Sequence, residues 1–164
     1  QTMNGSWGYR MTDQNYKSVD ELIRYLVSTA GRDANLLLNV GPQPDGNIPA
    51  AALERLAAMG EWLGTYGETI YGTRSTLVKP QPWGVTTHKD DRMWLHVFPA
   101  DAFKAAADGQ IYVPYKDGRK VASVTPYGSD VKLAFKQYKE GLFITLPEDM
   151  PADVPDYVVE VTFK

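Results

Sequence analysis

The chain has 164 residues, no cysteine and a formal net charge of −3 at pH 7, and its length fits one medium domain or two small ones. The missing cysteines exclude disulfides and thiolate metal sites, and the absence of a lysine and arginine block argues against a nucleic acid partner. No signal peptide or membrane-spanning run is visible, so no membrane association is expected. Because the sequence begins with Gln1 inside an apparently structured region, we expect a piece of a longer chain.

Residues 1–17 show no helical periodicity and predict the end of a strand that passes into a loop. Gly5 and Gly8 flank Ser6-Trp7, and Tyr9 follows. The flanking glycines make the backbone flexible and add little bulk, so the tryptophan ring could lie against a ligand. The alternative is that Trp7 and Tyr9 fill a core or an interface, as most aromatic side chains do.

A helix is predicted to begin at Ser18 and to end at Gly31. Ser18 and Glu21 have the spacing of a capping box, and Gly31 is a common helix terminator. One apolar stripe runs along the helix, which is typical of a helix that lies on a sheet; it comprises Val19, Leu22, Ile23, Leu26, Val27 and Ala30.

The stretch from Asn35 to Pro49, NLLLNVGPQPDGNIP, predicts a strand, a structured loop and the start of a helix. The apolar run 36–40 favours a strand buried on both faces, as in a parallel sheet with helical cover. The glycines and prolines of 41–46 then force turns, and Pro49 suits the first turn of a helix that continues to about Leu63. This alternation indicates a parallel sheet or a β/α barrel, where ligands bind at the carboxyl ends of the strands.

From about Ser75 the helical spacing gives way to short alternating runs separated by turn signals. We therefore place a domain boundary near residue 74, with an α/β part over 1–74 and an all-β part over 75–164. Such strands indicate an antiparallel sandwich or a small barrel; the runs are Gly84–Thr87, Met93–Phe98, Gln110–Tyr115, Lys120–Val124, Val131–Gln137, Leu142–Leu146 and Tyr157–Phe163.

The sequence lacks the motifs of several common kinds of functional site. There is neither a phosphate-binding Walker loop nor a dinucleotide fingerprint, so we expect no cofactor. His88 and His96 could approach each other across a hairpin, but no third ligand is evident, and we expect no metal site. A serine–histidine–aspartate triad cannot be assigned, because neither histidine lies near the α/β part.

Glycoside hydrolysis uses two carboxylates, which lie about 5 Å apart in retaining enzymes. In the α/β part only Asp13 and Asp45 fall in loops at the expected ligand end. Asp45 precedes Gly46 and is most simply a turn residue. We assign neither residue as a nucleophile, so the chain offers an aromatic suited to a sugar but no catalytic residue.

Three segments together resemble the α-L-fucosidases of glycoside hydrolase family 29, in their C-terminal part: TMNGSWGYR (2–10), LLLNVGPQPDGNIP (36–49) and GEWLGTYGETIYGTR (60–74). The resemblance implies the last β/α units of a (β/α)8-like barrel followed by an antiparallel β-sandwich. It also implies a retaining exo-α-L-fucosidase that removes terminal fucose by double displacement. Its nucleophile and acid/base would lie upstream of Gln1, in the N-terminal remainder of the barrel, and its substrate would be a fucosylated glycan. The family usually works in the periplasm, the lysosome or secretions.

One site residue is carried over by this resemblance: Trp7 matches the tryptophan of the SWGY motif, which would line the fucose pocket. We expect Asn4, Tyr9 and Asn39 to be structural. An alternative is that the β part is a carbohydrate-binding module on a non-catalytic barrel remnant, against the simpler view that its aromatics fill a core or an interface. The stacking residues would then be Trp83, Trp94, Tyr112 and Tyr115. A third interpretation is a complete small α+β protein without catalysis.

Overall fold

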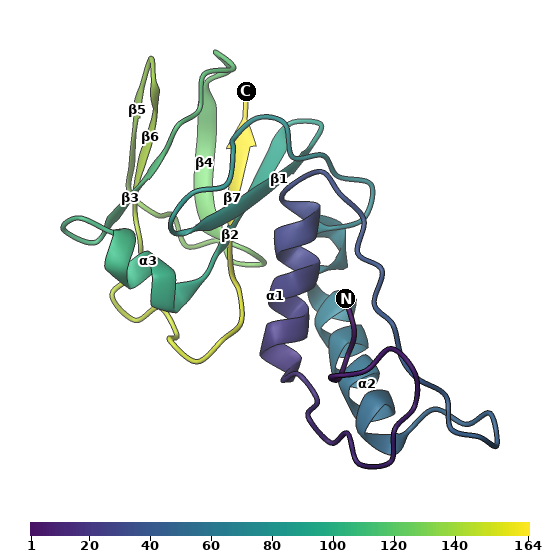
Figure 1. The fold of residues 1–164 in the computed structure, drawn as a ribbon. Helices are drawn as coiled ribbons and strands as arrows, with labels where there is room; N and C mark the ends of the chain where they lie inside the picture. Colours follow the sequence, from purple (N-terminus) through teal and green to yellow (C-terminus); the bar gives the residue numbers. More distant parts are fainter.

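A computed structural model describes all of residues 1–164 (Figure 1). We call residues 1–74, which contain the first three helices, the helical region, and residues 75–164, which contain the seven strands, the β region. The helical region projects from one side of the sheets. Its elements are α1 (Val19–Ala30), α2 (Ala50–Tyr66) and the short helix η1 (Gly67–Thr69). The β region contains β1 (Gly84–Lys89), β2 (Arg92–Val97), α3 (Pro99–Ala105), β3 (Gln110–Val113), β4 (Val121–Pro126), β5 (Phe135–Tyr138), β6 (Gly141–Thr145) and β7 (Tyr157–Phe163).

The first helix begins and ends as the sequence predicts. The Glu21 N–H donates to Ser18 Oγ at 3.1 Å, and the Ser18 N–H donates to Glu21 Oε2 at 2.7 Å, which completes the capping box. Leu22, Ile23 and Val27 of its stripe are buried. The second helix begins one residue after Pro49 and runs three residues beyond the predicted Leu63.

The segment 36–40 is extended but does not form a full strand. It runs parallel to residues 1–3: the Asn39 N–H donates to the Gln1 carbonyl at 2.8 Å, and the Met3 N–H donates to the Asn39 carbonyl at 3.0 Å. Thr2 and Asn39 form an isolated parallel bridge. The strand is thus represented by a single bridge, because only three residues of this chain lie beside it.

The prediction that this segment is buried on both faces is wrong for this chain. Leu38 and Val40 pack against a buried cluster between the helices, whereas Leu37, on the opposite face, is 68% exposed. The cluster comprises Met3, Leu22, Ile23, Val27, Ala52, Met59 and Val85. The second face stays open because nothing else in residues 1–164 covers it.

All seven predicted strands are present and form two antiparallel sheets, with orders β1-β2-β7-β4 and β3-β6-β5. The sheets share one core of 18 buried residues, to which β2 contributes Met93, Leu95 and Val97 and β6 contributes Leu142 and Ile144. Helix α3 was not predicted. Its seven residues begin at Pro99, a favoured first helical position, but are too few to show a helical period.

The helical region covers the part of the second face of the four-stranded sheet that β1 and β2 form. A Cβ on Gly31, at the end of α1, would lie 2.3 Å from Val85 Cβ, so only glycine permits this approach. Ser75 Oγ lies within hydrogen-bond distance of the Gly31 carbonyl at 2.7 Å and the Thr86 carbonyl at 2.6 Å. Val85 therefore belongs to the helical cluster although it lies on β1.

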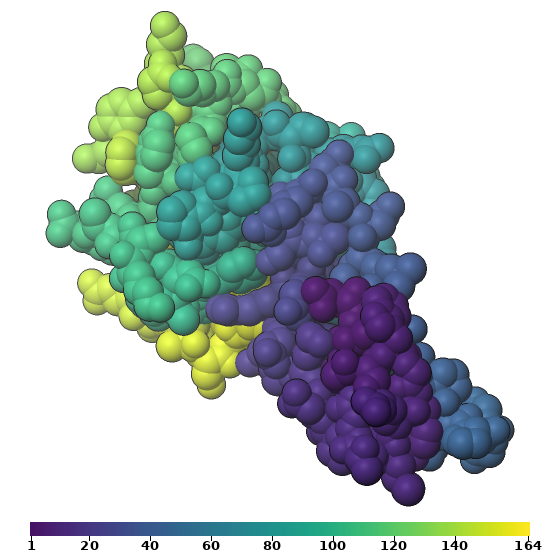
Figure 2. All heavy atoms as spheres, in the orientation of Figure 1, coloured from purple at the N-terminus to yellow at the C-terminus, as the bar shows by residue number.

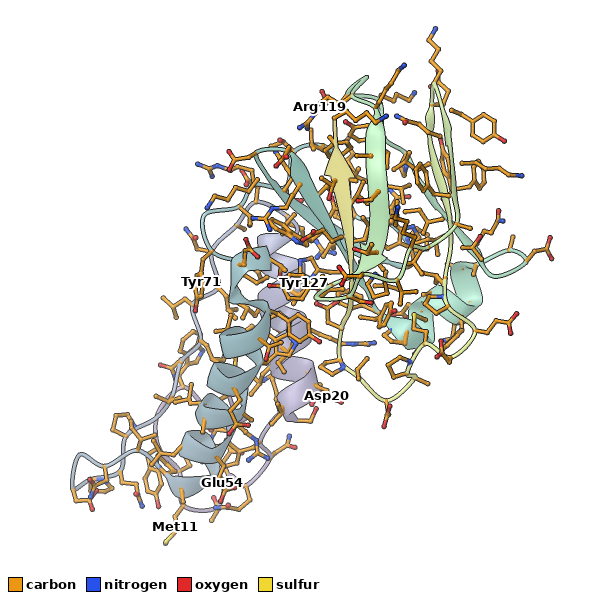
Figure 3. All side chains as sticks on the ribbon, turned by 180° about the vertical axis from the view of Figure 1, so that it is seen from behind. Met11, Asp20, Glu54, Tyr71, Arg119 and Tyr127 are labelled. Atoms are coloured by element: carbon orange, nitrogen blue, oxygen red, sulfur yellow. The ribbon has the colours of Figure 1, made fainter.

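An ionic network joins the same two regions beside α2. Arg92 on β2 pairs with Glu68 of η1, and the Tyr127 hydroxyl donates to Glu68 Oε2 at 3.4 Å. The hydrogen bond from Arg92 holds the pKa of Glu68 below its ordinary value, against the effect of burial. The rings of Tyr66 and Tyr127 lie 5.4 Å apart between centroids. Figure 3 shows Tyr127 at this junction.

The two histidines do not approach each other, contrary to the expectation from the hairpin. His88 pairs with Met93, while His96 lies opposite Val85, which is three residues before His88 in β1 and on the other face of the sheet. His96 is fully buried, with Nδ1 2.6 Å from Asp156 Oδ2 and Nε2 3.1 Å from Thr87 Oγ1. This network packs β1 and β2 against the helical region, because the Thr87 hydroxyl also donates to the Thr69 carbonyl at 2.6 Å.

Candidate functional site

The candidate site lies at the carboxyl ends of the two parallel segments, 1–3 and 36–40. Loops 4–17 and 41–49 both leave from this end. Figure 2 shows the N-terminal residues gathered on the lobe that faces away from the sheets, and the loop before α2 projects beyond it in Figure 1. Ligands of β/α proteins bind at this end of parallel strands.

Trp7 lies in the first of these loops and its side chain is 62% exposed. Its backbone is anchored, because Asn39 Nδ2 donates to the Trp7 carbonyl at 2.6 Å. Asn39 is also the bridge residue of segment 36–40, so its side chain fixes the SWGY loop to the strand end. This is a structural contact of the kind expected for Asn39. Trp7 does not fill the core of this chain and presents its indole to solvent.

A glycine lets the two loops meet. A Cβ on Gly41 would lie 2.6 Å from the Tyr9 backbone nitrogen and 2.7 Å from the Gly8 carbonyl carbon. Backbone atoms cannot yield as flexible side chains do, so any larger residue at 41 would push the SWGY loop away. The position of Trp7 therefore depends on both Asn39 and Gly41.

Asp13 holds the same loop from its other end. The Asn15 N–H donates to Asp13 Oδ1 at 3.2 Å, and a Cβ on Gly5 would lie 3.0 Å from Oδ2. Burial disfavours the charged form, but the Ser6 hydroxyl and three backbone N–H groups together hold the pKa of Asp13 below its ordinary value. Asp13 is therefore an ionised carboxylate that orders the loop.

Asp45 serves the turn that was predicted for it. Its Oδ1 accepts from the Asn47 N–H at 3.0 Å and its Oδ2 from Asn47 Nδ2 at 2.9 Å. These bonds lower the pKa of Asp45. Both carboxylates at this end are thus engaged within their own loops, and no group of three or more metal-ligating side chains gathers anywhere in residues 1–164.

Sequence reasoning missed two exposed apolar side chains, one in the Trp7 loop and one on the open face of segment 36–40. Met11, in the Trp7 loop, is 76% exposed, and Figure 3 shows it at the tip farthest from the β region. Leu37 shares the open face of its segment with Asn39. The sequence did carry a signal for Leu37. Neighbouring side chains of a strand point to opposite faces, so Leu37 lies on the face opposite Leu38 and Val40. Nothing in the sequence distinguishes Met11.

The aromatics considered for sugar stacking in the β region differ in exposure. Trp83, Trp94 and Tyr115 are buried, as the simpler view expected, and only Tyr112 is exposed, at 39%. The indole of Trp83 donates to the Tyr112 carbonyl at 2.9 Å, and that of Trp94 donates to Glu160 Oε2 at 2.8 Å.

Among the helices of the chain, none combines the length and the apolar character that a membrane span requires.

Comparisons with known proteins agree on one family. The family model described as α-L-fucosidase matches residues 1–68. An α-L-fucosidase of Dictyostelium discoideum is 30% identical over 168 residues, which cover 96% of this chain and 35% of that protein. The tissue α-L-fucosidase of Rattus norvegicus is 32% identical over 158 residues, or 92% of this chain and 33% of the relative. The chain thus spans about a third of the length of these curated relatives.

A solved structure extends the likeness across both regions. α-L-Fucosidase isoenzyme 1 from Paenibacillus thiaminolyticus superimposes with a TM-score of 0.81 at 28% identity, covering 99% of this chain and 38% of that one. The match therefore includes the helical region, with its open parallel pair, and the two antiparallel sheets. The chain belongs to the α-L-fucosidase family.

Proposed function

We propose that this chain forms part of a retaining exo-α-L-fucosidase that hydrolyses terminal α-L-fucose from glycans. Family membership supports the activity, and the chain's share of its relatives' length, about a third, leaves room for a catalytic pair elsewhere. Within residues 1–164 both carboxylate oxygens of Asp45 accept local hydrogen bonds. Asp13 accepts one through Oδ1, while its buried Oδ2 has no hydrogen-bond partner. The nucleophile and the acid/base of the double displacement are accordingly assigned to residues upstream of Gln1.

The helical region would supply the last β/α units of a (β/α)8-like barrel. Residues 1–3, α1, residues 36–40 and α2 follow one another as two such units, and the two extended segments pair in parallel. The exposed Leu37 lies on the face that strands and side chains of the remaining barrel would cover. Such barrels take roughly 250 residues, so the N-terminal remainder of the barrel is the partner of this region.

The β region would be the β-sandwich domain that follows the barrel, with the boundary near residue 74. Its 18-residue core draws on both sheets and receives nothing from α1 or α2. The contacts between the regions include the close approach of Gly31 to Val85 and the ring contact of Tyr66 with Tyr127. They also include polar bonds through Ser75, Thr87 and Glu68. This domain would support the barrel from the side opposite the Trp7 loop.

Trp7 would form an apolar wall of the fucose pocket. Fucose has a methyl group and an apolar C–H face, and an indole offers a flat surface to both. The observation that carries this assignment is the exposed indole at the carboxyl ends of two parallel segments, anchored by the 2.6 Å bond from Asn39. The pocket's carboxylates and hydroxyl-binding groups would come from the missing strands.

Hydrolysis of 4-nitrophenyl α-L-fucoside tests the activity. We expect residues 1–164 to be inactive and the natural N-terminally extended protein to be active. Activity of residues 1–164 alone would refute the assignment of the carboxylates upstream, and an inactive extended protein would refute the fucosidase function.

In the extended protein, Trp7→Ala should lower kcat/KM by up to about 100-fold, because burying a large apolar side chain contributes on the order of 1.5–3 kcal/mol. Phe103→Ala is the matched control: Phe103 is about as exposed, at 53%, but lies on α3. An equal effect of the two substitutions, or none at Trp7, would remove Trp7 from the pocket.

A further inference from the structure

A groove at the end of the β region farthest from the Trp7 loop gathers positive charge. Its volume is about 660 Å³, and it is lined by the edges of β4 and β5, the end of β7 and the 115–118 turn. Four lysines line it: Lys116, Lys120, Lys139 and Lys164. They are dispersed in the sequence, so the concentration of charge exists only in the folded chain. Figure 3 shows Arg119 at the same end and Met11 at the opposite one.

The charge of this groove is largely uncompensated. Lys116 pairs with Glu140 at 2.6 Å, whereas Lys120, Lys139 and Lys164 form no ion pair with any carboxylate of the chain. The neighbouring Arg119 is itself paired with Asp117. The net charge of the whole chain is −3, so this end has the opposite sign to the molecule as a whole. The four lysines outnumber Glu140, the one acidic residue that lines the groove, so the groove attracts anions.

The floor of the groove is held by one side chain. The Val121 N–H donates to Gln137 Oε1 at 3.0 Å, and Gln137 Nε2 donates to the Arg119 carbonyl at 2.8 Å. Gln137 on β5 thereby binds the beginning of β4 and links the edges of the two sheets. The groove is therefore a fixed feature of the fold.

An aromatic platform adjoins the groove on the outer face of the β3-β6-β5 sheet. Tyr112 and Phe143 are a cross-strand pair with ring centroids 4.9 Å apart, and Tyr138 meets Phe143 edge-on at 5.9 Å. All three are exposed, Tyr138 the most, at 57%. Tyr138 also lines the groove, so platform and groove form one continuous surface.

The platform is fixed by the turn between β5 and β6. The Tyr112 hydroxyl donates to the Glu140 carbonyl at 2.7 Å, and a Cβ on Gly141 would lie 2.7 Å from Tyr112 Cε2. Glycine at 141 therefore lets the Tyr112 ring lie along the turn. Lys136, paired with Phe143 across β5 and β6, adds a further cation at the edge of the platform.

We propose that this surface binds an anionic oligosaccharide, with pyranose C–H faces on the aromatic platform and sulfate or carboxylate groups at the lysines. A flat aromatic ring can pack against the apolar C–H face of a pyranose. An ammonium group without an ion-pair partner can form a charge-assisted hydrogen bond with a sulfate or carboxylate. The site is distinct from the Trp7 loop and goes beyond the proposed function. It rests on that function in one respect only: membership in a glycosidase family favours a glycan over a polynucleotide.

Calorimetric titration of the full chain tests the site, with a heparin-derived hexasaccharide as the probe and maltohexaose and a hexathymidylate as comparisons. We expect saturable binding of the sulfated hexasaccharide, weakened by added salt, with no binding of maltohexaose and weaker binding of hexathymidylate. Lys120→Gln combined with Lys139→Gln should weaken binding about tenfold, and Tyr138→Ala by a similar factor. Lys89→Gln with Lys104→Gln, which removes two exposed lysines elsewhere, should leave it unchanged.

Three outcomes would overturn the proposal. If Lys89→Gln with Lys104→Gln lowered the affinity for the sulfated hexasaccharide as much as the groove variant does, only the overall charge would matter. An unchanged affinity in Tyr138→Ala would remove the platform from the site. Hexathymidylate binding as tightly as the sulfated hexasaccharide would assign the surface to polynucleotides. Because none of these measurements uses fucoside hydrolysis, a failure here is distinguishable from a failure of the fucosidase assignment.

Discussion

The helical region and the β region differ in how completely each buries its own apolar side chains. The β region encloses 18 buried residues between two sheets. The helical region has a cluster of seven, one of which, Val85, comes from β1. Trp7, Leu37, Leu53 and Leu56 all remain exposed on the helical region. Since burying such a side chain contributes about 1.5–3 kcal/mol, the helical region leaves much of its available stability unused.

This difference is the one expected if, as proposed, the helical region belongs to a barrel and the β region is a separate sandwich. An antiparallel double layer closes on itself, because each sheet supplies the other's missing face. A β/α unit of a barrel cannot close, because its strand needs neighbours on both edges and cover on both faces. The contrast therefore predicts that substitutions will act differently in the two regions.

The largest effect is expected in the closed core. Leu95→Ala, at a fully buried position of β2, should lower the free energy of unfolding of the 164-residue chain by about 2–5 kcal/mol, because it leaves a cavity. Urea denaturation followed by circular dichroism measures it. Leu37→Ala deletes the same atoms from the open face and should change stability by less than about 0.5 kcal/mol. Similar losses at the two positions would mean that the open face is covered after all.

A smaller effect is expected where the two regions meet. Gly31→Ala places a Cβ 2.3 Å from Val85, and the forced separation should cost about 1–3 kcal/mol, measurable by the same denaturation. Gly60→Ala, within α2, is the control: a Cβ there meets nothing within 4 Å, and alanine should stabilise the helix by about 0.5–1 kcal/mol. A neutral Gly31→Ala would show that the regions are free to separate.

The smallest effect is expected at the ionic contact between the regions. Glu68→Gln removes the carboxylate that pairs with Arg92 and should cost about 0.5 kcal/mol at pH 7, the order of a partly exposed ion pair. Because the pKa of Glu68 is lower in the folded chain, its contribution is complete above the unfolded value of about 4.3 and is lost as the pH falls through the folded value. The stabilities of the two proteins should therefore converge as the pH is lowered toward 3.

Glu54→Gln provides the comparison for that measurement, because Glu54 is exposed on α2, away from the β region in Figure 3, and forms no ion pair. The free energy of unfolding of Glu54→Gln should equal that of the wild type. A difference between wild type and Glu68→Gln that persisted undiminished at pH 3 would contradict an electrostatic origin.

Local patterns in the sequence were sufficient for most of the elements. The capping box at Ser18 and Glu21 marked the start of α1, and alternating runs marked all seven strands, because caps and side-chain periods act over a few residues. The turn role of Asp45 and the burial of Trp83, Trp94 and Tyr115 also agreed with the simpler expectations. Helix α3 was missed because seven residues carry too little periodicity to stand out between strands.

Other features depend on partners distant in the sequence. The two histidines were separated by the register of β1 and β2, which places His96 opposite Val85, and a shift of one residue would have changed the face of each. The lysines of the groove are likewise brought together only by the meeting of β4, β5 and β7. No local signal encodes either arrangement.

By itself, the sequence determined helices α1 and α2, the seven antiparallel strands and, through the SWGY and NLLLNVGPQPDG motifs, the resemblance to the family. Only the tertiary structure decided that segment 36–40 is packed on one face and open on the other, and that Trp7 is held by Asn39 and Gly41 at the open end. The physical reason is that a short apolar run specifies burial but not what buries it: the covering surface is a property of neighbouring segments, which this chain supplies on one side only.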